Sequence, residues 1–331
     1  MHMPSPSFGA AQDLPNRHRR LRVLLSVAVA ATLASAASAE RQDPKAAPAP
    51  GSAPLMFRSS VNVVSVAAVV RDRRGRVMPS LRREDFEVVD GGERRPVVDV
   101  RADASAPASV ALLVDGSGSM SLGASRTFSQ RISESLLANL DPARDAAALL
   151  TFDTRLLTLC EFTRDFRQIL RRLPSVEAFG STALYDAVAG SAALVADRAR
   201  NRRAVVVLTD GLDNASAYPP GKVAWIASTI DVPVYVFDVG DRPDREGKAG
   251  PAPRDALAEL ARATGGDLFV ANTPLLVDAA VKRVAEELRH QYVIAFEGAI
   301  AMNDGLRHVE IRTRNPDLKI QARNWYRAAD E

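Results

Sequence analysis

The sequence of 331 residues has a single cysteine, Cys160, and only four histidines. One cysteine excludes an intramolecular disulfide, so stability has to come from a hydrophobic core. Cys160 lies in the apolar segment LLTLCEF and is expected to be a buried thiol. Two histidines lie within the first 39 residues, which leaves His290 and His308 for the rest of the chain. A catalytic Ser–His pair is therefore improbable.

A strong net charge is also missing once the N-terminus is set aside. The formal net charge is +3, and residues 1–39 account for it with four arginines against one aspartate. The remainder is near neutral, which gives no reason to expect nucleic-acid binding. The hydrophobic content of 47% and charged content of 25% are ordinary for a globular protein. The length fits one large domain with a smaller one, or two ordinary domains.

The N-terminus has the order of a secretory signal. The basic RHRRLR precedes the apolar VLLSVAVAATLA, and small residues lead up to Glu40. We expect residues 1–39 to be a signal peptide cleaved after Ala39, which places the protein outside the cell, in the periplasm or in the cell envelope. The apolar stretch approaches the length of a membrane span, so an uncleaved anchor is the alternative. Residues 40–56 are rich in Pro and Ala and predict a flexible linker.

Two flanking segments show strand patterns without a long amphipathic helix. Residues 57–105 contain the β-branched run VNVVSVAAVV and a hairpin signal at Asp90-Gly91-Gly92. This segment is too short to be a robust sandwich by itself. The β pattern returns in residues 298–331, whose strands are expected to complete a small all-β domain with the first segment.

Residues 106–297 alternate between strand and helix patterns. Helical periodicity appears at 181–200, 254–266 and 274–291. Such alternation predicts an α/β domain with a mostly parallel sheet that helices cover on both faces. The apolar runs that read as its strands are 110–115, 146–153, 156–162, 204–210, 232–240, 267–271 and 291–297.

The first of these runs continues into VALLVDGSGSM, in which a buried strand ends in a carboxylate and alternating serines. A phosphate-binding loop is excluded because Ser121 replaces the third glycine and Asp115 would repel a phosphate. A nucleophile elbow is excluded because neither serine has glycines two residues before and after it. An EF-hand loop needs Gly and Glu where Met120 and Arg126 stand. A plain strand-to-helix turn remains the alternative to a metal site.

A hard-cation site explains the alternation. Asp115, Ser117 and Ser119 can aim three oxygens at one point, and oxygen ligands favour Mg²⁺, Ca²⁺ or Mn²⁺. Thr182 precedes a helix and Asp210 ends a strand, so either can add an oxygen. Taken alone, Thr182 reads better as a helix N-cap and Asp210 as a turn residue.

Three segments together resemble the motifs of von Willebrand factor type A domains. VALLVDGSGSM, FGSTALYDAV and VVVLTDGLDN follow the order and rough spacing of that family. The resemblance implies a Rossmann-like domain with an intact metal-ion-dependent adhesion site made by Asp115, Ser117, Ser119, Thr182 and Asp210. The flanking β segments are similar to those of exported bacterial proteins related to the same family.

The resemblance implies a non-enzymatic binding module rather than a catalyst. Mg²⁺, or alternatively Ca²⁺ or Mn²⁺, is expected to dock an acidic side chain of a protein partner. An envelope assembly or scaffolding protein with a structural metal is the second hypothesis, and a metal-dependent hydrolase is the third. No nucleic-acid partner is expected, and a membrane is involved only if the N-terminal segment stays as an anchor.

Overall fold

The computed structural model describes most of the chain after the predicted linker. The described residues are 62–102, 104–121, 124–176, 180–198, 202–218, 222, 226, 232–240, 253–299 and 305–328. All of them belong to one contact unit, Arg58–Glu331. The predicted signal peptide and linker lie outside the described residues.

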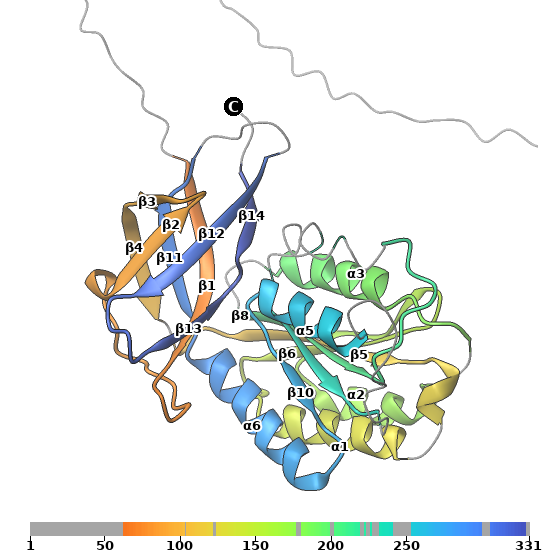
Figure 1. Ribbon diagram of the computed structural model, residues 1–331. Helices are drawn as coiled ribbons and strands as arrows, with labels where there is room; N and C mark the ends of the chain where they lie inside the picture. Colours follow the sequence, from red (N-terminus) through yellow and green to blue (C-terminus); the bar gives the residue numbers. More distant parts are fainter. Residues whose placement is uncertain are drawn as a thin grey trace, which may run out of the picture. The chain divides into compact units, whose positions relative to one another are not determined.

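A six-stranded sheet forms the centre of the α/β part (Figure 1). Its strand order is β10-β9-β8-β5-β6-β7, and all neighbouring pairs are parallel except β6 and β7. The prediction of a mostly parallel sheet is therefore confirmed. The strands are β5 (Ala108–Asp115), β6 (Ala146–Phe152), β7 (Leu156–Thr163), β8 (Arg202–Thr209), β9 (Val234–Asp238) and β10 (Leu268–Val270).

Helices cover both faces of this sheet, as predicted (Figure 1). Successive side chains of a strand point to opposite faces, so β5 contributes Leu112 to the core under α1, α2 and α6 and Leu113 to the core under α3 and α5. Cys160 is buried in the first of these cores. The helices are α1 (Ser125–Ala138), α2 (Phe166–Arg172), α3 (Leu184–Ala196), α5 (Pro253–Ala263) and α6 (Pro274–Arg289), with short 3₁₀ turns at Arg83–Asp85, Gly118–Ser121 and Leu173–Ser175.

The flanking segments build two four-stranded antiparallel sheets, ordered β13-β1-β11-β4 and β14-β12-β2-β3. One core lies between them, with side chains from both segments such as Val66 and Ile311. The expected small all-β assembly is thus present, while the domain boundaries themselves stay predictions. The strands are β1 (Val63–Arg71), β2 (Phe86–Asp90), β3 (Glu93–Arg95), β4 (Val97–Ala102), β11 (Tyr292–Glu297), β12 (Leu306–Thr313), β13 (Lys319–Ala322) and β14 (Trp325–Arg327).

One strand belongs to a different sheet from the one that the sequence pattern predicts. The alternating pattern assigns residues 291–297 to the α/β part, yet β11 pairs antiparallel with β1 and β4. Its inward side chains Tyr292, Ile294 and Phe296 fill the core between the two antiparallel sheets. An apolar run of this length fits either sheet, so periodicity alone does not distinguish them.

The predicted hairpin connects β2 to β3. Asp90 pairs with Glu93, and Gly91 and Gly92 form the two-residue loop between them. Both glycines have positive φ, 58° and 90°, as the favoured hairpin turn with two left-handed residues requires. This explains why two glycines stand in succession here.

A buried ion pair links the first antiparallel sheet to the α/β part. Arg71 of β1 donates to Glu287 of α6, and the Glu287 side chain is fully buried. Arg283 Nε donates to the same carboxylate at 3.1 Å, and Gln321 Nε2 of β13 lies 3.5 Å from its other oxygen. The Glu287 carboxylate of the α/β part therefore accepts hydrogen bonds from side chains of both the α/β part and the antiparallel sheet.

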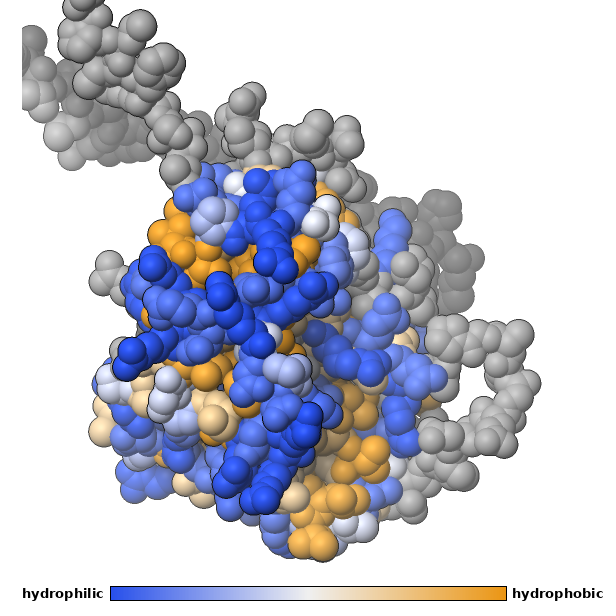
Figure 2. Space-filling view, turned by 60° about the vertical axis from the view of Figure 1, so that its left-hand side comes forward, coloured by the Kyte–Doolittle hydropathy of each residue, from blue (hydrophilic) through white to orange (hydrophobic). Residues whose placement is uncertain are grey.

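The surface mixes polar and apolar residues. In Figure 2 hydrophilic residues make up much of the visible face, and apolar ones lie between them in smaller groups. Scattered exposed apolar residues of this kind are normal for a globular protein. Within the described part of the chain, no helix is long and apolar enough to cross a membrane. The most exposed large apolar side chains are Val63, Val98, Leu157, Leu194, Leu275, Leu276 and Val293.

Candidate metal centre

Strand β5 carries Asp115 to the carboxyl end of the parallel sheet. The Asp115 side chain is almost fully buried, and both of its oxygens accept hydrogen bonds. Oδ1 accepts from the backbone N–H of Ser117 at 2.8 Å, and Oδ2 accepts from the hydroxyl of Thr209 at 2.6 Å. Gly116 N–H donates to the Phe152 carbonyl at the end of β6. The carboxylate is thus fixed by its own loop and by the neighbouring strand β8.

Ser117 and Ser119 place two hydroxyl oxygens side by side. Their Oγ atoms lie 3.1 Å apart, and Ser117 is buried. Two ligands at a right angle around Mg²⁺ are about 3.0 Å apart when each lies at the usual Mg–O distance. The spacing of the two hydroxyls therefore fits adjacent positions of an octahedral magnesium site.

The protonation of Asp115 is shifted by its surroundings. Burial raises the pKa of this carboxyl to about 6, and the negative charge of Asp210 contributes in the same direction. The hydrogen bonds from Thr209 and Ser117 oppose the shift because they stabilise the charged form. A cation beside both carboxylates would relieve the repulsion between them.

Asp210 follows β8, the strand next to β5. Gly211 makes the turn after it with a φ of 85°, and its N–H donates to the Thr209 hydroxyl at 3.1 Å. Gly240 packs against this turn, because a Cβ placed there would lie 3.3 Å from the Asp210 Cβ and 3.2 Å from Asp238 Oδ1. Asp210 is therefore confined to the same end of the sheet as Asp115.

Thr182 is buried in the loop before α3, and its backbone is bonded to the loop after β8. Its N–H donates to Asn214 Oδ1 at 2.8 Å, and its carbonyl accepts from the N–H groups of Asn214 and Ala215. The next residue, Ala183, donates to the Asp153 carbonyl beyond β6 at 2.7 Å. Because β5 lies between β6 and β8, these bonds hold the Thr182 loop across the end of β5.

The five predicted residues thus lie at one end of the sheet, and three kinds of interaction relate them to one another. Hydrogen bonds join Asp115 to Ser117 and Ser117 to Ser119, charge couples Asp115 to Asp210, and loop bonds place Thr182 over the same strand end. In the described ranges, no three His, Cys, Asp or Glu side chains gather so that they could hold a metal ion. The predicted set differs in kind, with two carboxylates and three hydroxyls, and its metal binding stays a prediction.

The donor chemistry fits Mg²⁺ better than zinc. Every candidate ligand is an oxygen, and magnesium prefers carboxylates, hydroxyls and water. Ser117, Ser119 and Thr182 would offer hydroxyl oxygens, while Asp115 and Asp210 would supply charge and orient water. A bound ion would supply Lewis acidity at this end of the sheet.

Two further strand-end aspartates have other roles. Asp153 Oδ1 accepts from the Arg155 N–H and the Thr154 hydroxyl, and these bonds lower the pKa of Asp153. Asp238 pairs with Arg254 Nε at 2.6 Å. The motif gave no reason to include either in the site, and their contacts give none.

Sequence reasoning missed one residue that contacts the site and undervalued two others. Thr209 is fully buried and bonds Asp115 from 94 positions away. From the sequence, Asp213 and Asn214 are expected to be capping or turn residues rather than residues that tune the metal site, and in the structure they bond the loop of Thr182. Thr209 directly precedes Asp210 in an apolar strand, and a polar residue there is the only signal that the sequence offers.

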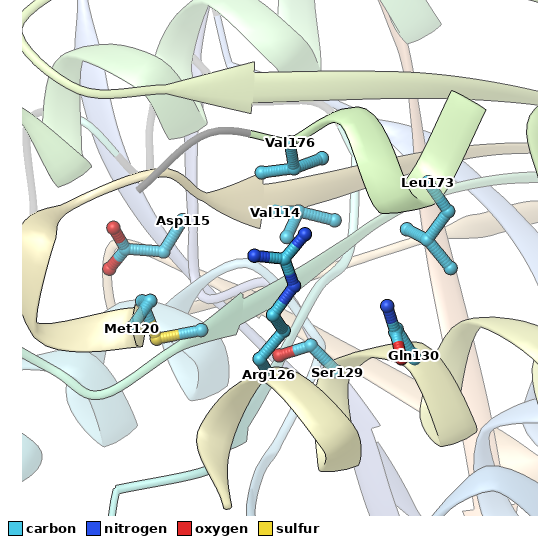
Figure 3. Close-up of a pocket in the computed structure, with 8 residues that line it drawn as sticks. All are labelled: Val114, Asp115, Met120, Arg126, Ser129, Gln130, Leu173 and Val176. Carbon is cyan, nitrogen blue, oxygen red and sulfur yellow. The ribbon is translucent and has the colours of Figure 1, made fainter. Parts of the chain in front are cut away.

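A small cavity of about 30 Å³ adjoins Asp115. Figure 3 shows Arg126 reaching from α1 toward Val114, with Ser129 and Gln130 on the same helix and the Asp115 carboxylate near the loop of Met120. A volume of this size matches one or two water molecules and is far below that of a small-molecule site. It does not provide an enclosed substrate pocket.

Comparison with known proteins finds one matching family model and several solved structures that are similar to this chain. Residues 110–212 match the model of the von Willebrand factor type A domain. No curated protein matches the chain. An aerotolerance-related membrane protein from Bacteroides fragilis is 21% identical, with a TM-score of 0.45 over 55% of this chain and 98% of that one.

Two other solved structures are similar at lower identity. A von Willebrand factor type A protein from Catenulispora acidiphila is 11% identical over 82% of this chain and 76% of that one, with a TM-score of 0.46. The PilB minor pilin from Streptococcus sanguinis is 11% identical over 56% of this chain and 62% of that one, with a TM-score of 0.42. The matched residues 110–212 hold all five predicted ligands, strands β6, β7 and β8 and most of β5, and this part of the chain matches a von Willebrand factor type A domain.

Proposed function

We propose that the chain is an exported protein-binding module that uses a divalent cation, Mg²⁺ in the first place, to dock an acidic side chain of a protein partner. The observation that carries this proposal is the donor set at the end of β5. The neutral hydroxyls of Ser117, Ser119 and Thr182 would bind the ion directly, while Asp115 and Asp210 would act largely through water, so the ion retains affinity for an outside carboxylate.

The geometry favours docking over a purely structural metal. Asp115 is already held by Ser117 and Thr209, and Thr182 by Asn214, through hydrogen bonds that need no ion. A site preformed in this way does not need the ion in order to fold, and Mg²⁺ adds only the stability that its affinity and concentration give. The ion is then available for a partner rather than needed for the fold.

The first experiment measures metal binding and stability together. Titration calorimetry of the protein without residues 1–39 is expected to detect Mg²⁺ binding in the wild type and none in Asp115→Ala. Asp153→Ala is the matched control because Asp153 directly follows the neighbouring strand β6, its carboxylate bonds to Thr154 and Arg155 of its own turn, and the substitution leaves its backbone carbonyl in place. A chelator should leave the protein folded and lower its melting temperature only by the amount that the measured Mg²⁺ affinity accounts for.

The second experiment tests docking. Envelope proteins captured by the wild type with Mg²⁺, but not with chelator and not by Asp115→Ala, are candidates for the partner. Binding of a purified candidate should then be abolished by changing one of its Asp or Glu residues to the amide. A wild type that binds neither Mg²⁺, Mn²⁺ nor Ca²⁺ would overturn the proposal, and a large loss of melting temperature on chelation would favour a structural metal instead.

A further inference from the structure

Helix α3 begins without a side-chain cap of its own. Its N-cap residue is Ala183, which has no side chain to accept a hydrogen bond from the first turn. The free N–H groups bond instead to the loop after β8: Leu184 N–H to Asp213 Oδ1 at 2.8 Å, and Tyr185 N–H to Ser216 Oγ at 3.0 Å. A segment about thirty positions later thus caps the helix.

The same loop holds the residue just before the helix. Asn214 bonds Thr182 at two points, since its side-chain oxygen accepts the Thr182 N–H and its backbone N–H donates to the Thr182 carbonyl. Both peptide groups that flank the Thr182 side chain are therefore fixed. The backbone orientation from which the hydroxyl projects depends on Asn214.

The bonding is reciprocal, which makes the two segments one unit. Asp213 Oδ1 also accepts the Ser216 hydroxyl at 2.6 Å, and Asp186 in the first turn of α3 accepts from the Ala217 N–H at 2.9 Å. These bonds lie on the β8 side, and the bond from Ala183 to Asp153 fixes the β6 side. Removal of one acceptor should loosen the β8 side while leaving the other.

We propose that Asp213 and Asn214 are positioning residues for the metal centre, which set the place of the Thr182 oxygen without binding the cation themselves. This inference rests on the proposed function, because it assigns Thr182 as a ligand. Groups that orient metal ligands commonly change metal affinity by about 10-fold to 100-fold when they are removed. A residue that merely capped the helix would change stability alone.

Four variants separate these roles. Asn214→Ala and Asp213→Ala remove the two acceptors, and Asp213→Asn retains an acceptor oxygen as the rescue. The matched control is Asp165→Ala, because Asp165 accepts a hydrogen bond from the Arg167 N–H at the start of α2, away from the site. It removes a helix cap without touching Thr182.

The first readout needs no metal. Amide hydrogen exchange in the metal-free protein should accelerate at Thr182 in Asn214→Ala and at Leu184 in Asp213→Ala, by about tenfold or more, because each amide loses its acceptor. The rescue variant and Asp165→Ala should leave both amides protected. Unchanged exchange at both amides in the alanine variants would overturn the positioning role.

The second readout is the cation itself. Mg²⁺ affinity by calorimetry is expected to fall about tenfold or more in both alanine variants, to recover in Asp213→Asn and to stay at the wild-type value in Asp165→Ala. With Mn²⁺ as a paramagnetic probe, the number of bound waters should rise by one as the Thr182 oxygen is lost. Equal affinities with a binding wild type would overturn the inference alone, whereas a wild type that binds no cation would overturn the proposed function as well.

Discussion

At the scale of single residues, two opposing effects act on the charge of the Asp115 carboxylate. Burial disfavours its charge, yet hydrogen bonds from Thr209 and Ser117 and any nearby cation favour it. The result is a carboxyl group with a pKa of about 6 in the metal-free protein. Its ionised form is less stable in the folded protein than in the unfolded chain, so its contribution to stability falls as the pH rises from about 4 to about 6.

Asp115→Asn is therefore expected to stabilise the metal-free protein at neutral pH. The amide keeps the shape of the side chain and removes a charge whose burial is unfavourable. The free energy of unfolding at pH 7 should rise by about 1 to 3 kcal/mol, and the gain should vanish near pH 4. Urea denaturation in chelator at pH 4 to 8 measures this, and a variant less stable than wild type at pH 7 would contradict it.

The candidate site residues could be predicted where the residues that mark them lie close together in the sequence or at the end of a predicted strand or helix. Asp115, Ser117 and Ser119 stand within five positions, and Thr182 and Asp210 stand at recognisable ends of secondary structure. Thr209 gave almost no signal, because its partner is Asp115 in another strand. A hydrogen bond between two distant segments produces no recurring residue pattern from which the sequence could predict it.

At the scale of elements, the end of α5 shows how a glycine joins two parts of the chain. Gly265 has a φ of 86°, and its N–H donates to the Arg262 carbonyl at the end of the helix. A Cβ there would lie 2.9 Å from the backbone nitrogen of Arg323 and 3.1 Å from the carbonyl carbon of Ala322. Gly265 thus allows the left-handed backbone conformation at the end of α5, and its missing side chain lets Ala322 and Arg323 approach closely.

Two glycine substitutions separate these effects. Gly75 also has a positive φ, 79°, but a Cβ placed there would meet no other atom within 4 Å, so Gly75→Ala should cost about 1 kcal/mol from backbone strain. Gly265→Ala adds a steric clash and should cost about 2 to 4 kcal/mol. Chemical denaturation of both variants tests this, and equal losses would show that the clash is relieved without cost.

Helices could be predicted from the sequence where apolar residues recur at clear helical spacing. Helix α3 presents Leu184, Val188 and Val195 to the core, as the pattern indicated. Helix α1 gave no such pattern, because its buried face includes Ser129 and Ser133, and the Ser133 hydroxyl is satisfied by the Ser129 carbonyl. Polar residues that find partners within the helix conceal its buried face from a hydropathy reading.

At the scale of the whole molecule, Glu287 is the charged group on which the two parts depend most directly. It is fully buried and receives Arg71 from the antiparallel sheet and Arg283 from its own helix. Tyr235 of β9 lies in the same environment, and burial together with the charge of Glu287 raises its pKa. A charge in this position is tolerable only while its partners stay in place.

A double-mutant cycle measures that dependence. Glu287→Leu leaves the Arg71 guanidinium buried without its carboxylate and is expected to lower the free energy of unfolding by about 3 to 5 kcal/mol. Glu287→Leu with Arg71→Met removes both charges and should lose markedly less. Urea denaturation of Glu287→Leu, Arg71→Met and the double variant gives the coupling energy, and additive losses in the double variant would contradict the expectation.

The register of β1 has a consequence for how the chain is made. β1 is the first described strand, yet Val63 pairs with Glu297 and Arg71 pairs with Lys319, far along the sequence. Both of its hydrogen-bonding edges therefore stay open during synthesis until β11 and β13 have been made. An apolar strand with open edges is prone to pair with other chains, and contacts so distant in sequence form slowly. Strand β1 is thus exposed to wrong pairing until β11 and β13 follow, and truncation before β11 would leave it without either partner.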